Sequence, residues 1–334
     1  MRQIDKNTFF DITQNFLLVP STQTRGHYEM FALSGAERIK FFVNDIENPT
    51  IACIGHERRF LNKKMLLIIG ECYADMPNFE SEKKAHRYFT TLREFYRELK
   101  SATYDIIEIQ SDAMYDFRYE TALRQAGFLR PVGQFSMPTT KIIDLTDEIV
   151  YYENWRRFIR KSLQHDLKIE IIDKISHKDC VDFVQLQNDL SERKKLSVGY
   201  SVAQIHALCS DKSFQLFFAL HNGQRVAALI VHKDEHRKHI HLNNVASNAV
   251  ALRTSASFFI YYSVINYLKE AGYKSFDLEK LVPAENELNN VFKFKDGISG
   301  KYEVLNGEWS WYKKKYYRPL MYFVKKYLFK RIEL

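Results

Sequence analysis

The sequence predicts an α+β protein built from two halves of similar plan. The first observation is an Asn222-Gly223 pair between two apolar runs, which favours a tight hairpin because both residues accept positive φ. The second is a long apolar helix pattern at 255–271, which Gly272 ends. The third is that a comparable order of apolar runs and a long amphipathic segment precedes residue 147.

The second half supplies its expected elements in a clear order. Strands are predicted at 214–220, 226–231 and 239–246, followed by the helix at 255–271, a buried strand at 275–278 and a polar helix near 285–290. An antiparallel meander, a helix, a strand and a helix form the core of an acyltransferase-type α+β fold. The fold alone does not give the reaction.

The first half repeats this plan without a residue-level repeat. Its expected strands are 39–43, 50–55, 64–69, 106–109 and 139–145, and its expected helices are 81–100 and 119–126. The polar stretch 21–27 is expected to be a solvated loop rather than a phosphate contact. The predicted domains are therefore 1–147 and 148–311, with a basic aromatic tail at 312–334.

Composition narrows the class of protein. The 334 residues are 46% hydrophobic, enough for sizeable cores, and 49 basic against 41 acidic residues give a net charge of +8, which favours an anionic partner. No apolar run is long enough to span a membrane, and the first residues lack the apolar core of a signal peptide. The four cysteines lack zinc spacing, so we expect reduced thiols, no metal and a cytoplasmic protein.

Three motifs resemble one known family. They are Gly272-Tyr273-Lys274-Ser275-Phe276-Asp277-Leu278, Phe294-Lys295-Asp296-Gly297, and Trp155 followed by an Arg/Lys-rich helix. Together they resemble the Fem-type (FemABX) peptidyltransferases, tandem GNAT-fold enzymes that transfer amino acids from aminoacyl-tRNA onto peptidoglycan precursors. The resemblance implies two tandem GNAT-like (acyl-CoA N-acyltransferase-like) domains with an acceptor cleft between them.

The resemblance also implies the catalytic residues. Lys295 matches a family lysine near the donor, where a cation would offset charge on the donor carbonyl oxygen. Asp277 follows an apolar strand and would either position the acceptor amine or cap a helix around Pro283-Ala284-Glu285. For Lys295 the alternative is an ordinary surface lysine. No Ser-His-Asp or Cys-His-Asp arrangement is evident, so direct attack by the amine is expected.

Two groups of residues are candidates for substrate binding. Ser191 and Arg193 match a family element that contacts a phosphorylated acceptor, and Arg offers a fork of donors suited to phosphate. The acceptor-binding set is completed by Tyr200 and Tyr73. The candidates for donor or phosphate binding are Arg156, Arg160, Arg253 and Lys293. For each cation the alternative is a solvated basic surface or a surface ion pair.

The identity of the donor stays open between aminoacyl-tRNA and acyl-CoA or an acyl-carrier thioester, with no tightly bound cofactor. The stretch Leu252-Arg253-Thr254-Ser255-Ala256-Ser257 lacks the glycines of a CoA pyrophosphate loop, which disfavours CoA. Only about a dozen residues separate Tyr200 from the next strand, which leaves no room for the coiled-coil arm of some tRNA-dependent members. Glu279 stands where many relatives carry glycine.

The tail and one strand face carry further alternatives. Aromatic residues interleaved with Lys and Arg from Trp309 to Arg331 suit an anionic membrane surface, and the alternative is a terminal helix docked on the second domain. His239 and His241 are expected on a polar strand face rather than at a metal. The expected function is acyl or aminoacyl transfer to an amine of a cell-envelope precursor, which is nucleotide- or lipid-linked. A non-catalytic tRNA- or membrane-binding module is the alternative from another class.

Overall fold

The computed structural model describes residues 1–35, 38–60, 62–75, 82–131, 138–195, 199–281 and 288–328. The chain divides into two compact units. Unit 1 comprises 1–24, 35–139 and 303–334, and unit 2 comprises 25–34 and 140–302. The predicted domain boundary at 147/148 stays a prediction, and the compact units differ from it because each takes segments from distant parts of the chain.

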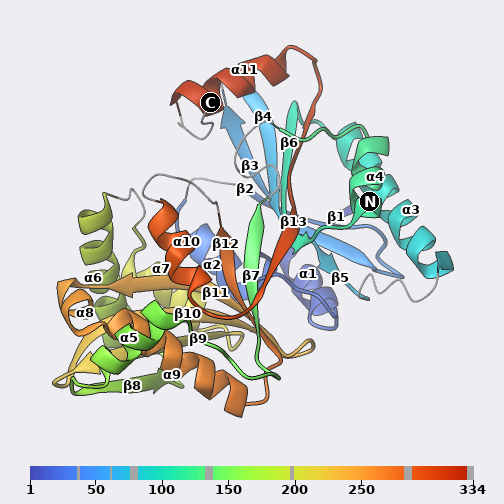
Figure 1. Cartoon of the computed structure of the whole chain (residues 1–334). Helices are drawn as coiled ribbons and strands as arrows, with labels where there is room; N and C mark the ends of the chain where they lie inside the picture. Colours follow the sequence, from blue (N-terminus) through green and yellow to red (C-terminus); the bar gives the residue numbers. More distant parts are fainter. Residues whose placement is uncertain are drawn as a thin grey trace. The chain divides into compact units, whose positions relative to one another are not determined.

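Unit 2 holds one mixed sheet with helices on both faces (Figure 1). Its strands run in the order β7-β12-β11-β10-β9-β8. The strands are β7 (Thr139–Asp144), β8 (Leu167–Ile172), β9 (Phe214–His221), β10 (Gln224–Asp234), β11 (His239–Ser247) and β12 (Ser275–Leu281). The helices are α2 (Arg25–Ala32), α5 (Glu153–Ser162), α6 (His177–Lys194), α7 (Val202–Cys209), α8 (Ala249–Thr254), α9 (Ala256–Glu270) and α10 (Leu288–Asp296).

Alternation along the strands of unit 2 divides its core between the two faces of the sheet. Phe217 and Ala219 of β9 pack with α5 and α9, whereas Leu216 and Phe218 pack with α6 and α7. The β9–β10 hairpin turns at Asn222 and Gly223, whose φ values are 51° and 77°. The predicted hairpin is therefore confirmed, together with the strands on either side of it.

In unit 1 the strands run in the order β1-β2-β3-β4-β6-β13, with β5 paired to β3. The strands are β1 (Arg2–Ile4), β2 (Arg38–Val43), β3 (Ile51–Phe60), β4 (Lys63–Ile69), β5 (Cys72–Tyr73), β6 (Ile106–Met114) and β13 (Lys301–Tyr312). The helical elements are α1 (Lys6–Thr13), η1 (Ser21–Gln23), α3 (Glu82–Ser101), α4 (Phe117–Gln125), α11 (Tyr317–Phe323) and the π-helical turn η2 (Val324–Leu328).

Both units share an order of elements. In each, three antiparallel strands lead through a long helix to a strand that is parallel to the last strand of the meander, and a short helix follows. The predicted α+β class with two tandem GNAT-like units is confirmed. Two strands, β7 and β13, do not pair within the half of the chain that precedes them. Strand β7 follows α4 but lies beside β12, and β13 follows α10 but lies beside β6.

One strand was missed, and two sequence interpretations are corrected. Strand β13 was not foreseen, although it pairs Trp309 with Ile109 and buries the Trp309 ring completely. Residues 25–32 form a helix rather than a solvated loop, and His27 is buried there. The tail helix α11 docks on unit 1, through Tyr317 and Met321, and not on the second half of the chain.

Candidate active site

The two parallel strands of unit 2 separate midway along their length. Strands β11 and β12 pair only from His239 to His241 and from Ser275 to Asp277. A bulge in β11 accompanies this separation, because Ile230 pairs with Asn244 and Val231 with Leu242, which leaves Asn243 extra. The bulge redirects β11 and leaves the end of β12, after Asp277, without β11 as a partner.

Asp277 lies at this point of separation and is 4% exposed. Its Oδ1 accepts a hydrogen bond from Thr140 Oγ1 and another from the Glu279 backbone N–H at 2.7 Å. Glu279 has a φ of 69°, in the left-handed region that favours glycine. The glutamate is thus held in a costly conformation, and the carboxylate of Asp277 is one of the groups that hold it there.

Lys295 lies in the last turn of α10, which contacts the end of β12 (Figure 1). Its side chain is buried, and its Nζ donates to the carbonyl oxygens of Glu279 and Lys280, each at 3.2 Å. Burial lowers the pKa of Lys295, and the charges of Glu279 and Asp277 oppose that effect. Lys293, two residues earlier, is exposed, so the structure distinguishes the two lysines of the motif.

The segment that carries Lys295 is fixed by the Trp155 ring of α5. Trp155 is buried, and its Nε1 donates to the Phe294 carbonyl oxygen at 2.7 Å. The ring covers Gly297 so closely that a Cβ there would lie 1.9 Å from Trp155 Cδ1. Trp155 and the segment around Lys295, 139 residues apart at the Trp155–Phe294 hydrogen bond, therefore form one packing unit.

The carboxylate of Asp296 anchors the same segment from the other side. Buried Lys141 donates to Asp296 Oδ1 and to the Asp296 carbonyl oxygen, both at 3.1 Å. The hydroxyl of Tyr302 also donates to Asp296 Oδ1. These hydrogen bonds lower the pKa of Asp296, the bond from Tyr302 contributing most. Trp155, Lys141 and Tyr302 together restrain the backbone on both sides of Lys295.

Two tyrosines share the electrostatic environment of Glu279. Burial raises the pKa of Tyr200, and the Glu279 charge raises it further. The same two causes raise the pKa of Tyr261, which lies on α9 and is buried. Lys295, Asp277, Glu279, Tyr200 and Tyr261 are hereafter called the β12-end cluster. They offer a buried cation, carboxylates and neutral phenols where the strands separate.

The remaining predicted residues lie elsewhere. Arg193 of α6 donates to the Asn248 carbonyl oxygen at 2.9 Å and to the carbonyl oxygen and Oγ of Ser247, both at 3.1 Å, so it fastens the end of β11. Ser191 is on the same helix. On α5, Trp155, Ile159 and Ser162 form the buried face, as predicted, and Arg156 and Arg160 are exposed. Arg253 is exposed on α8. Residues 283–285, where Asp277 was predicted to cap a helix, lie outside the described residues.

Tyr73, the fourth predicted acceptor contact, is sealed inside unit 1. It lies beside Glu71, whose Oε1 accepts hydrogen bonds from the hydroxyls of Tyr96 and Tyr119. Glu71 is 1% exposed, and burial raises its pKa against the opposing effect of these hydroxyls. Glu71 and these tyrosines occupy the position in unit 1 where β4 and β6 end their parallel pairing, at Ile69 and Gln110.

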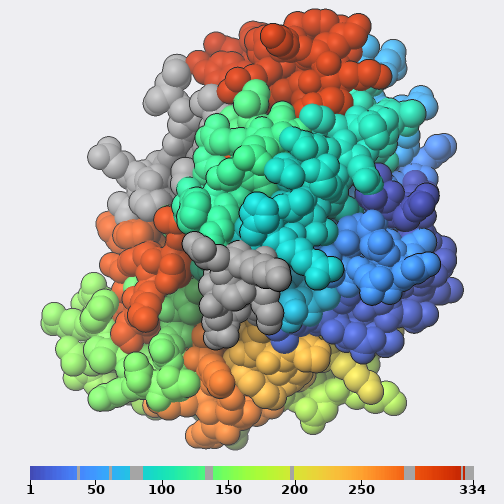
Figure 2. All heavy atoms as spheres, turned by 90° about the vertical axis from the view of Figure 1, so that its right-hand side faces the viewer, coloured from blue at the N-terminus to red at the C-terminus, as the bar shows by residue number. Residues whose placement is uncertain are grey.

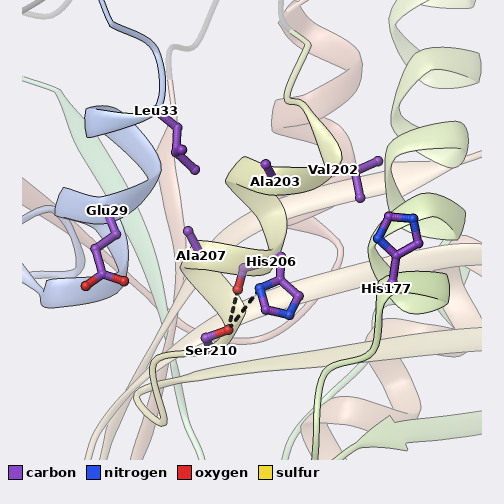
Figure 3. Close-up of a pocket in the computed structure, with 8 residues that line it drawn as sticks. All are labelled: Glu29, Leu33, His177, Val202, Ala203, His206, Ala207 and Ser210. Atoms are coloured by element: carbon purple, nitrogen blue, oxygen red, sulfur yellow. Dashed lines mark hydrogen bonds between the residues drawn. The ribbon is translucent and has the colours of Figure 1, made fainter.

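A groove of about 800 Å³ lies in unit 2 away from the β12-end cluster (Figure 3). Glu29 of α2 and Leu33, just after that helix, face Ala203 and Ala207 of α7 across it, and His177 opens α6 at its far side. None of the predicted site residues lines this groove. His177 is at the opposite end of α6 from Ser191 and Arg193, so the groove does not belong to the candidate site.

Sequence reasoning missed three residues in or beside the β12-end cluster. Glu279 was noted only as a departure from glycine, and its positive φ shows why glycine suits that position. Thr140 and Tyr261 had no motif, and only the tertiary pairing of β7 with β12 and the packing of α9 bring them near Asp277 and Glu279.

The His239 ring lies 2.7 Å from Ser275 Oγ, and burial lowers the pKa of His239 to about 4.

Within the described ranges, no group of three or more His, Cys, Asp and Glu side chains could hold a metal ion. Over the same ranges, no helix has the length and apolar character needed to cross a membrane.

Comparison with known proteins supports the fold. No family model matches the chain, and no curated protein does. Solved structures do match over nearly their full length. A structure titled FemX has a TM-score of 0.70 at 12% identity and covers 96% of this chain and 100% of its own. L-PGS from Bacillus licheniformis has a TM-score of 0.62 at 12% identity and covers 98% and 97%. The C-terminal domain of a putative lysylphosphatidylglycerol synthetase from Agrobacterium fabrum has a TM-score of 0.59 at 13% identity and covers 96% and 95%.

Proposed function

We propose that this chain transfers an acyl or aminoacyl group to an amine of a cell-envelope precursor, and that the reaction takes place at the β12-end cluster of unit 2. The observation that carries the proposal is the burial of Lys295 against the Glu279 and Lys280 carbonyl oxygens, beside two carboxylates. Lysine side chains are seldom buried, and a buried lysine with a lowered pKa beside carboxylates is typical of a functional site.

Lys295 would act on the donor carbonyl. When the acceptor nitrogen attacks the carbonyl carbon, negative charge develops on the carbonyl oxygen, and the ammonium of Lys295 would stabilise it. The tetrahedral intermediate then breaks its ester C–O or thioester C–S bond and forms the amide. The leaving group departs as an alkoxide or a thiolate and takes up the proton that the attacking amine has lost, which releases an alcohol or a thiol.

Glu279 would receive the proton that the amine loses, because a carboxylate at this position lies within electrostatic reach of Lys295 and both phenols. Asp277 would position the site, since it holds the Glu279 backbone and helps to keep Lys295 protonated. Tyr200 would contact the acceptor. The assignment uses no covalent acyl-enzyme.

The anion-binding residues have distinct proposed parts. Arg156, Arg160, Arg253 and Lys293 are exposed cations suited to donor phosphate, whether from tRNA or from CoA. Ser191 would contact the acceptor, and Arg193 would act through the end of β11 that it fastens. Tyr73 is buried in unit 1, and the proposed site does not include it.

The test is a transfer assay with three donors in parallel. The full chain is incubated with charged tRNA, acyl-CoA and an acyl-carrier thioester, and amide formation is followed on a muropeptide precursor. Transfer from one donor supports the proposal and identifies that donor, including the CoA alternative. Salt-dependent tRNA binding without transfer from any donor would instead support a non-catalytic binding module.

The residue test pairs two lysines of one motif. Lys295→Met is expected to lower kcat by about 100-fold or more with a small change in acceptor KM, because the interaction forms in the transition state. Lys293→Met is the matched control for kcat, since it removes the same charge from an exposed position of the same helix, where loss of a donor-phosphate contact would raise the donor KM and leave kcat unchanged. Equal effects of the two substitutions would contradict the role of Lys295.

A further inference from the structure

The C-terminal segment 316–328 presents two apolar stripes, of which the protein covers only one. The inner stripe, Tyr317, Met321 and Val324, is 2–4% exposed, and its first two members pack on Met65 of β4 and Ile106 of β6. A helix that only closes a domain needs no second apolar stripe.

The outer stripe follows the same helical spacing one residue earlier. Its members are Tyr316, Leu320, Phe323 and Tyr327, with exposed fractions of 57%, 38%, 56% and 57%. The Phe323 and Tyr327 ring centroids are 4.6 Å apart, so the stripe continues from α11 into η2. Figure 2 shows this segment as an outer surface of the chain. Because the inner stripe is docked, the outer stripe is held facing away from Met65 and Ile106.

The charge around the stripe has one sign. Between Trp309 and Arg331 the sequence has eight Lys or Arg residues and no Asp or Glu, a charge equal to the +8 of the whole chain. Lys313, Lys314 and Lys315 are exposed, and Lys314 Nζ lies 5.8 Å from the centre of the Tyr316 ring. Lys326 Nζ lies 5.9 Å and 5.3 Å from the Tyr322 and Tyr327 rings.

We propose that this outer stripe and its lysines form a docking surface for an anionic lipid bilayer. Leu320 and Phe323 have no polar group to offer a nucleic acid, and the hydrocarbon boundary of a bilayer would remove them from water. Tyrosine rings are favoured at the headgroup level, where Tyr316 and Tyr327 would lie. Each cation near an anionic surface strengthens binding about fivefold, which fits a segment without acids.

The proposal is independent of the transfer reaction, since binding is measured without donor or acceptor. The full chain is mixed with vesicles of neutral lipid and with vesicles containing 30% anionic phosphatidylglycerol, and the bound fraction is measured by flotation. The expected result is binding at least ten times tighter to anionic vesicles, weakened by raising the salt concentration.

Two variants test the two components. Leu320→Ser/Phe323→Ser is expected to weaken vesicle binding at least tenfold, whereas Phe117→Ser, at a site 63% exposed in the same unit, should leave it unchanged. Lys313→Gln/Lys314→Gln/Lys315→Gln should weaken binding by a similar factor. Its matched control is Lys168→Gln/Lys174→Gln/Lys178→Gln, three exposed lysines of unit 2. Thermal melts check that each variant folds. If the apolar variant does not fold, the vesicle binding of the lysine variant decides between the outcomes.

Three results would overturn the proposal. The first is equal binding to neutral and anionic vesicles, and the second is vesicle binding that neither test variant weakens. The third is that the chain does not bind vesicles but binds single-stranded RNA tightly, and that the lysine variant weakens this RNA binding. The last result would assign the surface to nucleic acid.

Discussion

The two units bury different ionisable groups at equivalent points of one topology. In unit 1 the parallel strands end their pairing at Ile69 and Gln110, and Glu71 follows, enclosed by Tyr73, Tyr96 and Tyr119. In unit 2 the parallel strands end their pairing at His241 and Asp277. Glu279 follows on β12, and its carbonyl oxygen accepts a hydrogen bond from Lys295.

The difference lies in how each unit treats its buried charge. Unit 1 buries a carboxyl among phenols, and burial raises its pKa against the opposing hydrogen bonds from their hydroxyls, which favours a neutral, closed core. Unit 2 sets Lys295 against carbonyl oxygens and near two carboxylates, whose charges oppose the lowering of its pKa by burial. Under the proposed function, one topology serves as a scaffold in one unit and as a site for chemistry in the other.

The largest expected effect is on the pH dependence of transfer. If the ammonium of Lys295 stabilises the oxyanion, the rate should fall as pH rises through its lowered pKa, below the ordinary value of 10.5. Lys295→Arg should keep the charge, move that falling limb to higher pH and retain more activity than Lys295→Met. A pH–rate profile with the same limb in wild type and Lys295→Arg would assign the limb to another group.

A smaller effect on rate is expected at Glu279. Glu279→Gln should lower kcat by about 10- to 100-fold, since it removes the proposed proton acceptor. Glu279→Gly should lower the rate similarly while raising the free energy of unfolding by up to about 1 kcal/mol, because glycine accepts a φ of 69°. Steady-state kinetics and urea unfolding of both variants check this. An active Glu279→Gly enzyme would reduce Glu279 to a structural residue.

Packing of the two motifs in unit 2 predicts a loss of stability. Gly297→Ala should cost about 1–3 kcal/mol, because its Cβ would meet the Trp155 ring at 1.9 Å. Gly199→Ala is the control, since a Cβ there meets nothing within 4 Å. Urea unfolding measures both. Equal stability of the two variants would show that Trp155 and the segment after Lys295 are not packed as described.

The smallest expected effect concerns Glu71. Its folded pKa is raised above the unfolded value of about 4.5, so its stabilising contribution is complete below that pH and is lost as pH rises through the folded pKa. Glu71→Gln should remove this loss and make unfolding less pH-dependent, whereas the exposed Asp11→Asn should not. Urea unfolding across the pH range tests it. An unchanged profile in Glu71→Gln would mean that Glu71 is ionised in the folded chain.

Local sequence signals predicted much of the fold and little of the site's detail. The Asn222-Gly223 turn, the buried face of α5 and the long helices follow from periodicity and turn chemistry, which act over a few residues. Strand β13 could not be foreseen, because its partner β6 is about 200 residues earlier. Lys295 was found by its motif, but its burial depends on carbonyl oxygens of β12.

The polar cluster of unit 1 shows the same limit from the other direction. Glu71 follows a strand and carries no motif, and its environment is assembled from α3, α4 and β5. Tyr73 was assigned to the acceptor on local grounds, and the packing of unit 1 encloses it. Tertiary packing, which one sequence does not display, decides whether such a side chain faces a substrate or a core.

The comparison of the units is tested most directly by single-turnover transfer rates of Lys295→Met and Glu71→Gln, measured side by side with the active donor. If chemistry resides in unit 2 alone, Lys295→Met loses about 100-fold or more and Glu71→Gln stays within about twofold of wild type. A large loss in Glu71→Gln with near-normal turnover in Lys295→Met would contradict it.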